Sequence, residues 1–175
     1  PQGIYEAYRR MYEAMGIQQI EQVLPPPPQP QPMSPAMENA GFLQMQPAQA
    51  FADQDHDAHI KSHLTLLRSP IIASAPPGQQ QVAAMIQAHI FQHVDFKARE
   101  MAQQDPEVTQ MQQQMQQTQQ QMQQEAQVNP MAAQQAQMQM QQMQQQMQLI
   151  VEDKVSQITA QIIEELAPEL APPQQ

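Results

Sequence analysis

The chain has 175 residues, a formal net charge of −10, no cysteine and four glycines. Aromatic residues make up only 4% of it, so it lacks the large apolar groups of a thick globular core. The seven basic residues are scattered, which argues against binding nucleic acid through its phosphates, and the absence of cysteine excludes disulfides and thiolate catalysis. We therefore predict a mostly α fold built from thin helical seams, with no membrane partner.

The first predicted element is a helix over residues 1–24. Its apolar residues recur at helical spacing, and they are Ile4, Tyr8, Met11, Tyr12 and Met15. Gly16 is expected to end or kink this helix. Residues 25–52 begin with a run of prolines and are predicted to be a linker followed by an extended segment around Phe42 to Met45. Because the chain begins at Pro1, we expect it to be a fragment of a longer protein.

A helical region is predicted over residues 53–104. Its first helix is expected to start with Asp53 as N-cap and to be closed by Pro70. Ile60, Leu64 and Leu67 form its apolar stripe, which should pack against a second helix over residues 79–104. The buried side of that second helix is expected to carry seven residues: Val82, Met85, Ile86, His89, Ile90, His93 and Phe96.

Residues 105–167 are nearly all Gln, Met and Ala, and they are predicted to form long helices divided by Pro130, with residues 168–175 as a disordered tail. One apolar seam runs along them with steps of mostly three and four residues, as in a coiled coil. We predict that this seam packs against parallel copies of the chain around the axis of an oligomer. Its members are Met111, Met115, Met122, Met140, Met143, Met147, Val151, Val155, Ile158 and Ile162. The alternative is a disordered low-complexity tract.

The five histidines form two groups at helical spacing. His56, His59 and His63 share one helix face, and His89 and His93 are four residues apart. Such spacing can chelate a transition metal, but the HExxH pattern is absent. We therefore predict structural imidazoles bonded to carbonyls or carboxylates, with no metal, no cofactor and no catalytic residue. Nucleophile elbows, phosphate loops and dinucleotide fingerprints are also missing from the sequence.

Residues 33–67 resemble the C-terminal region of portal proteins, the head-to-tail connectors of short-tailed bacteriophages. In that family a proline-rich linker precedes a Glu-Asn pair, an extended piece, a helix with a DH..HI..H pattern and a second helix with an H...H pair. The matching residues are Glu38, Asn39, Asp55, His56, His59, Ile60, His63, His89 and His93. The Gln-rich helices resemble the portal barrel by composition alone.

The resemblance implies a structural subunit of a ring, usually of twelve identical subunits, at one vertex of the virion. The ring is the channel for genome packaging and ejection, and its partners are the capsid, the terminase and tail adaptor proteins. Double-stranded DNA passes through without specific binding. Residues 53–104 would belong to the crown and residues 105–167 to the barrel, with the clip and stem upstream of Pro1.

Other classes stay open at this point. The chain could be a Gln-rich interaction segment of a regulatory protein, or part of a scaffolding or internal virion protein with long helices. A metallohydrolase piece that uses the histidines would need carboxylates brought in from elsewhere.

Overall fold

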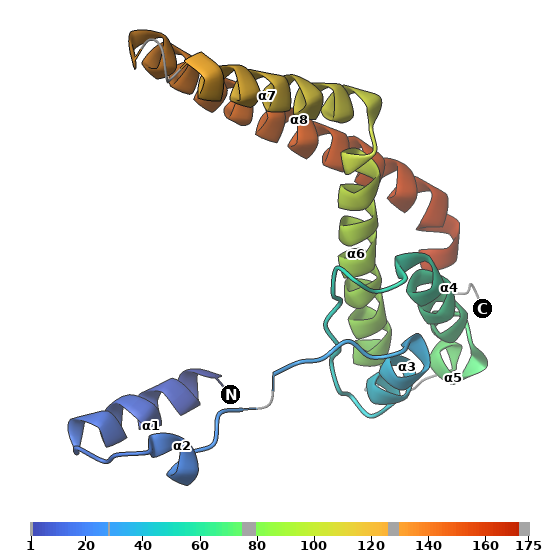
Figure 1. Cartoon of the computed structure of the whole chain (residues 1–175). Coiled ribbons are helices and arrows are strands. Elements are labelled where there is room, and N and C mark those ends of the chain that lie inside the picture. Colours follow the sequence, from blue (N-terminus) through green and yellow to red (C-terminus); the bar gives the residue numbers. More distant parts are fainter. Residues whose placement is uncertain (1, 28, 75–79, 126–129, 172–175) are drawn as a thin grey trace. The chain divides into compact units, whose positions relative to one another are not determined.

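The computed structural model of this chain is mostly helical, and the part that it describes contains no strand (Figure 1). The described residues are 2–27, 29–74, 80–125 and 130–171. Contacts divide the chain into two compact units, Pro1–Gln31 and Pro32–Gln175. The division falls inside the proline-rich stretch, so the predicted linker does separate two folding units.

The first unit contains α1 (Gln2–Ala14) and α2 (Ile20–Val23). The single helix predicted over residues 1–24 is thus two helices. Gly16 lies between them with a φ of +72°, in the left-handed region where a side chain would be strained. The expectation that Gly16 ends the helix is confirmed.

The second unit opens with a helix in a region where the sequence predicts only a short helical turn before the extended piece around Phe42 to Met45. α3 spans Pro35–Leu43. Ser34 is its N-cap, because the Ser34 hydroxyl accepts a hydrogen bond from the Met37 amide at 3.4 Å, and Pro35 suits the first turn. Phe42 is completely buried in the core cluster. This apolar anchor explains why residues 35–43 belong to the packed unit.

α4 spans His56–Leu67 and begins two residues later than predicted. Asp55, not Asp53, is the N-cap, since its carboxylate accepts a hydrogen bond from the Ala58 amide at 3.0 Å. Pro70 does not close this helix but occupies the first turn of the short α5 (Pro70–Ala73).

α6 spans Gln80–Gln103, within one residue of the predicted bounds. The predicted packing of the first apolar stripe against this helix is confirmed, because both sets of residues belong to one buried cluster. The cluster joins Ile60, Leu64 and Leu67 of α4 to four aliphatic residues of α6, which are Val82, Ile86, Ile90 and Val94. Of the seven residues predicted on the buried side of α6, Met85 and Phe96 are only half-buried.

α7 (Pro106–Glu125) and α8 (Pro130–Leu170) follow the predicted division of the Gln-rich region. Residues 126–129, which join them, lie outside the described part. Pro168 lies inside α8, so the prediction that the helix ends before residue 168 was wrong. Pro168 has no backbone N–H, so the helix lacks the hydrogen bond from this residue to the carbonyl four residues earlier. The predicted disordered tail falls partly on residues 172–175, which also lie outside the description.

The methionine seam packs against another helix of the same chain. α7 and α8 lie side by side (Figure 1), and the Thr118 hydroxyl of α7 lies 3.9 Å from the Met143 sulfur of α8. Met111, Met115 and Met122 are the less exposed positions of α7, as a seam requires. A single narrow apolar face is therefore present as predicted, but its partner in this structure is the other helix of the same chain.

The second half of the seam has a different partner. Val155 and Ile162 are buried in the core cluster with α4 and α6, and Val151 and Ile158 pack against it. This part of α8 closes the core formed by the earlier helices, so it is not a free surface for copies of the chain. Among the described helices, none is both long and apolar enough to cross a membrane.

Candidate functional site: a buried glutamate and histidine cluster

All five histidines of the chain and one glutamate meet inside the second unit. Glu38 is on α3; His56, His59 and His63 are on α4; and His89 and His93 are on α6. Each of these side chains is at most 6% exposed. Buried polar groups are costly unless they have partners, so this cluster is an ordered feature of the fold.

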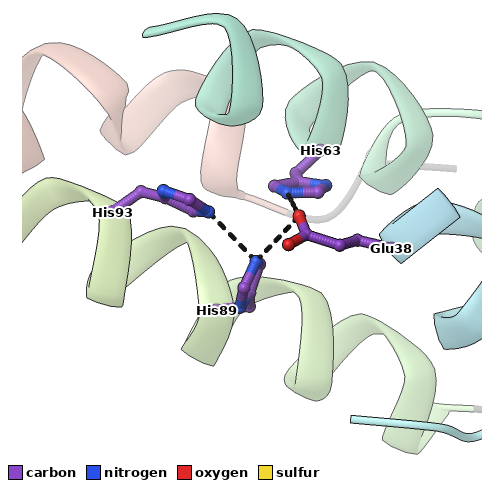
Figure 2. A group of neighbouring side chains, drawn as sticks. All are labelled: Glu38, His63, His89 and His93. Atoms are coloured by element: carbon purple, nitrogen blue, oxygen red, sulfur yellow. Dashed lines mark hydrogen bonds and ion pairs between the residues drawn. The ribbon is translucent and has the colours of Figure 1, made fainter. Parts of the chain in front are cut away.

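Four of the six side chains point toward a common centre (Figure 2). The Glu38 Oε2 atom lies 3.1 Å from His63 Nε2 and 3.2 Å from His89 Nε2. His93 Nε2 lies 3.0 Å from His89 Nε2. The cluster thus brings one carboxylate oxygen and three imidazole nitrogens together from three helices.

The remaining two histidines lie at the edge of this group. His56 Nδ1 is 2.9 Å from His93 Nδ1, and the His56 ring stacks on Phe96 with an interplanar angle of 4°. His59 Nδ1 donates to the Asp55 carbonyl at 2.7 Å, while its Nε2 lies 3.2 Å from the Met33 carbonyl. The His59 ring nitrogens thus face backbone carbonyls. His56 contacts the His93 ring on the side away from His89.

A second layer of contacts fixes the ring of His63. Its Nδ1 atom lies 2.7 Å from Asn39 Oδ1. The amide nitrogen of Asn39 in turn donates to the hydroxyl oxygen of Ser62 at 3.0 Å and to the Ser62 carbonyl at 3.4 Å. Phe42 packs edge-on against the rings of His63 and His89. The Glu-Asn pair and the following Phe thus dock α3 onto α4 and α6.

The pKa values favour a charged Glu38 carboxylate beside neutral His63 and His93 rings. Burial alone acts to raise the pKa of Glu38, but its contacts with His63, His89 and Gln54 outweigh burial and leave that pKa below its usual range. Burial lowers the pKa of His63. Burial, together with the nearby histidines, lowers the pKa of His93 to about 3.

Such a group has the composition of a metal site. The ligand atoms of Glu38, His63, His89 and His93 all lie within 4.8 Å of one another. Imidazole nitrogen and carboxylate oxygen are ordinary ligands of zinc and related divalent ions. Among the described residues, the cluster offers no serine or cysteine nucleophile beside these imidazoles, so its chemistry is that of holding a proton or a cation.

The residues singled out from the sequence are brought together almost completely. The structural role predicted for the histidines, as imidazoles bonded to carbonyls and carboxylates, is confirmed by His59 and His63. Asp55 contributes as the cap of α4, and Ile60 as a core residue. Glu38 was predicted by the resemblance only, and its contact with the histidines was not predicted. The available signal was a single charged residue in the segment from Pro35 to Leu43.

The seam methionines lie on α7 and α8 and take no part in this cluster. No family model, curated protein or solved structure matches the chain.

Proposed function

We propose that this chain is a C-terminal part of the portal protein of a short-tailed bacteriophage. Its role would be structural, as a subunit of the ring through which the genome is packaged and ejected at the head-tail connection. It would have no catalytic activity, and it would reside at the portal vertex of the virion. Its partners would be identical subunits in a ring, probably of twelve, and the capsid, terminase and tail adaptor proteins.

The observation that supports this proposal best is the convergence of the motif residues. Glu38, Asn39, His63 and His89 were singled out because they match the family pattern, although they lie up to 51 residues apart. In the structure they form one buried network of contacts. Motif residues that contact one another in the fold support a family relationship better than motif residues scattered over the surface. Their contacts give a structural reason for the spacing of these residues in the sequence.

The surface of the hairpin formed by α7 and α8 supports the proposal independently. The sequence from Val108 to Val151 contains a single charged residue, Glu125, and no Lys or Arg. Holding double-stranded DNA through its phosphates requires clustered basic side chains. A neutral glutamine surface next to an acidic C-terminal segment would let DNA pass without retaining it, as a channel requires.

The first unit also suits a chain that works within an assembly. The side chains of Ile4, Tyr8 and Met11 on α1, and of Met15 directly after it, are between 45% and 66% exposed. They recur on one face of the helix, and contiguous apolar surface of this kind commonly marks an interaction site. In the proposed ring this face would be covered by the preceding part of the protein or by a neighbouring subunit.

The test is the assembly state of the full-length protein that contains this chain. Native mass spectrometry should give a closed oligomer of one defined size. Replacing the six seam methionines of α7 and α8 with Ser should leave that size unchanged, since they take no part in the core that joins α4, α6 and the end of α8. A monomer, or an elongated oligomer of variable size, would contradict the proposal. The elongated oligomer would instead favour a scaffolding or internal virion protein whose helices associate along their length.

A further inference from the structure

The imidazole rings of the cluster carry too few N–H protons to make a hydrogen bond at each of their close contacts. A neutral imidazole carries one N–H, so it can donate to only one acceptor. His63 faces an acceptor on each side, with Asn39 Oδ1 at 2.7 Å from Nδ1 and Glu38 Oε2 at 3.1 Å from Nε2. The orientation of the Asn39 amide is set by its donation to Ser62, whose backbone carbonyl can only accept. On one side of the His63 ring, a nitrogen lone pair therefore faces a lone pair of the neighbouring oxygen.

The shorter contact places the proton of His63 on Nδ1, directed at Asn39. The same reasoning applies to His93, whose Nδ1 lies 2.9 Å from His56 Nδ1 and can donate to it. His89 Nε2 lies between Glu38 Oε2 and His93 Nε2 and cannot donate fully to both. In this arrangement the Nε2 lone pair of His63 faces Glu38 Oε2, and the Nε2 lone pair of His93 faces His89 Nε2.

We propose that Glu38, His63, His89 and His93 bind one structural zinc ion, which joins α3, α4 and α6. A divalent cation at their centre satisfies all four lone-pair donors together. The inference does not depend on the proposed ring, because it rests on the geometry of one chain.

The spacing fits such an ion after small side-chain movements. Zinc bonds of about 2.0–2.1 Å in a tetrahedron place ligand atoms about 3.4 Å apart. Neighbouring ligand atoms here are separated by 3.0 to 3.2 Å, and all four lie within 4.8 Å of one another. Three nitrogens and one oxygen favour zinc over calcium or magnesium, which prefer oxygen-rich coordination.

The surroundings resemble those of a structural site more than a catalytic one. Metal-binding histidines usually have the second ring nitrogen held by a hydrogen bond, which fixes the ring for coordination. Asn39 supplies this contact for His63, and His56 supplies it for His93. Among the residues that the structure describes, none forms a hydrogen bond with the buried His89 Nδ1. Because the four ligand side chains are at most 2% exposed, they leave no open coordination position for a substrate.

This inference revises the sequence-based expectation of no metal. That expectation rested on the missing HExxH pattern, which describes two ligands on one helix. Here only His89 and His93 share a helix, and the other two ligands come from α3 and α4. The pairing could not be seen without the packing of the three helices.

The experiment uses the full-length protein purified without a polyhistidine tag, stripped with a chelator and then titrated with Zn²⁺ or Co²⁺. We expect one metal per chain by elemental analysis, an intense visible absorption of Co²⁺ typical of tetrahedral coordination, and a higher melting temperature with metal. These readouts are taken on the wild-type protein, so they do not depend on whether a variant folds. If the protein bound no stoichiometric metal and its melting temperature did not change on metal addition, the proposal would be overturned. The close contact between Glu38 and His63 would then be explained by a proton shared between them.

Three variants sharpen the assignment. His93→Gln should abolish stoichiometric binding, since it removes a ligand. Asn39→Ala should weaken zinc binding by about 10- to 100-fold, as the loss of a supporting contact commonly does. His59→Gln is the control, because His59 is also buried and its Nδ1 donates to the Asp55 carbonyl. Its Nε2 lies 3.2 Å from the Met33 carbonyl and 3.5 Å from Glu38 Oε2, but it is not among the four mutually close ligand atoms. Retention of zinc by His59→Gln supports the four-residue site, and its loss there would overturn that assignment.

Discussion

The packing of α3, α4 and α6 differs in kind from the packing of α7 against α8. In the first region, buried Glu38 and His63 have partners at defined distances and angles. In the second region, the half-buried positions are occupied by methionines such as Met115 and Met143, whose flexible thioethers tolerate imperfect register. Directional contacts specify one arrangement of helices, whereas an adaptable seam specifies only that two helices lie together.

This difference separates two tasks within one unit. The histidine region fixes how three helices meet, and the hairpin supplies length with a surface of neutral glutamine. Mutations should therefore have large effects in the first region and small effects in the second.

The largest effect is expected for Glu38→Ala. Removal of this carboxylate leaves ring nitrogens of His63 and His89 buried without their partner, and each buried polar group left unsatisfied costs about 1–3 kcal/mol of unfolding free energy. Urea denaturation of the full-length protein should show the loss, with Glu165→Ala on the exposed face of α8 as control. Equal stability of the two variants would show that the cluster does not hold the helices together.

A core leucine should give the next largest effect. Leu64 is 4% exposed and belongs to the cluster between α4, α6 and α8, so Leu64→Ala should cost about 2–5 kcal/mol of unfolding free energy. Leu64→Asp should prevent assembly altogether. Leu149 on α8 is 67% exposed, and Leu149→Ala should change stability by less than about 0.5 kcal/mol. Thermal unfolding of Leu64→Ala and Leu149→Ala measures the difference in stability between them. Equal stability of these two variants would mean that α4 faces solvent.

A single seam methionine should matter less. Met143 is half-buried beside Thr118, so Met143→Ala should cost about 1 kcal/mol, roughly half the value for burying a whole apolar side chain. The control is Met138→Ala, since Met138 is 58% exposed on the same helix. Circular dichroism during urea titration measures both. A loss for Met143→Ala as large as that for Leu64→Ala would place the hairpin seam in a rigid core.

The smallest effect is expected at the base of the hairpin. The ammonium group of Lys154 lies 3.1 Å from a Glu107 carboxylate oxygen and 3.3 Å from an Asp105 carboxylate oxygen. Ion pairs at the surface contribute little because water screens them. Lys154→Ala should leave the melting temperature unchanged within error, and the value should be insensitive to added salt. A clear drop in melting temperature would show that these charges hold α8 against the junction between α6 and α7.

The sequence predicted what depends on local patterns. Asp105-Pro106 and Pro130 marked helix starts correctly, because proline suits a first turn. Local patterns could not choose between Asp53 and Asp55 as a cap, since both are aspartates just before the helix. The choice depends on burying His56, which is a tertiary requirement.

The candidate site needed information that periodicity does not contain. Spacing placed the histidines on shared helix faces, but it could not show that both faces turn toward Glu38. The seam illustrates the same limit. Its residues were identified from spacing, but spacing could not show that its partner is another helix of the same chain and not a copy of the chain.

The most direct test of the account is a cryo-electron microscopy reconstruction of the full-length protein. We predict a closed ring of identical subunits around an open channel, in which each subunit contains a compact core built from Glu38 and the histidines, with its α7–α8 hairpin projecting from it. A reconstruction without a channel, or one in which residues 106–170 are extended, would contradict the account.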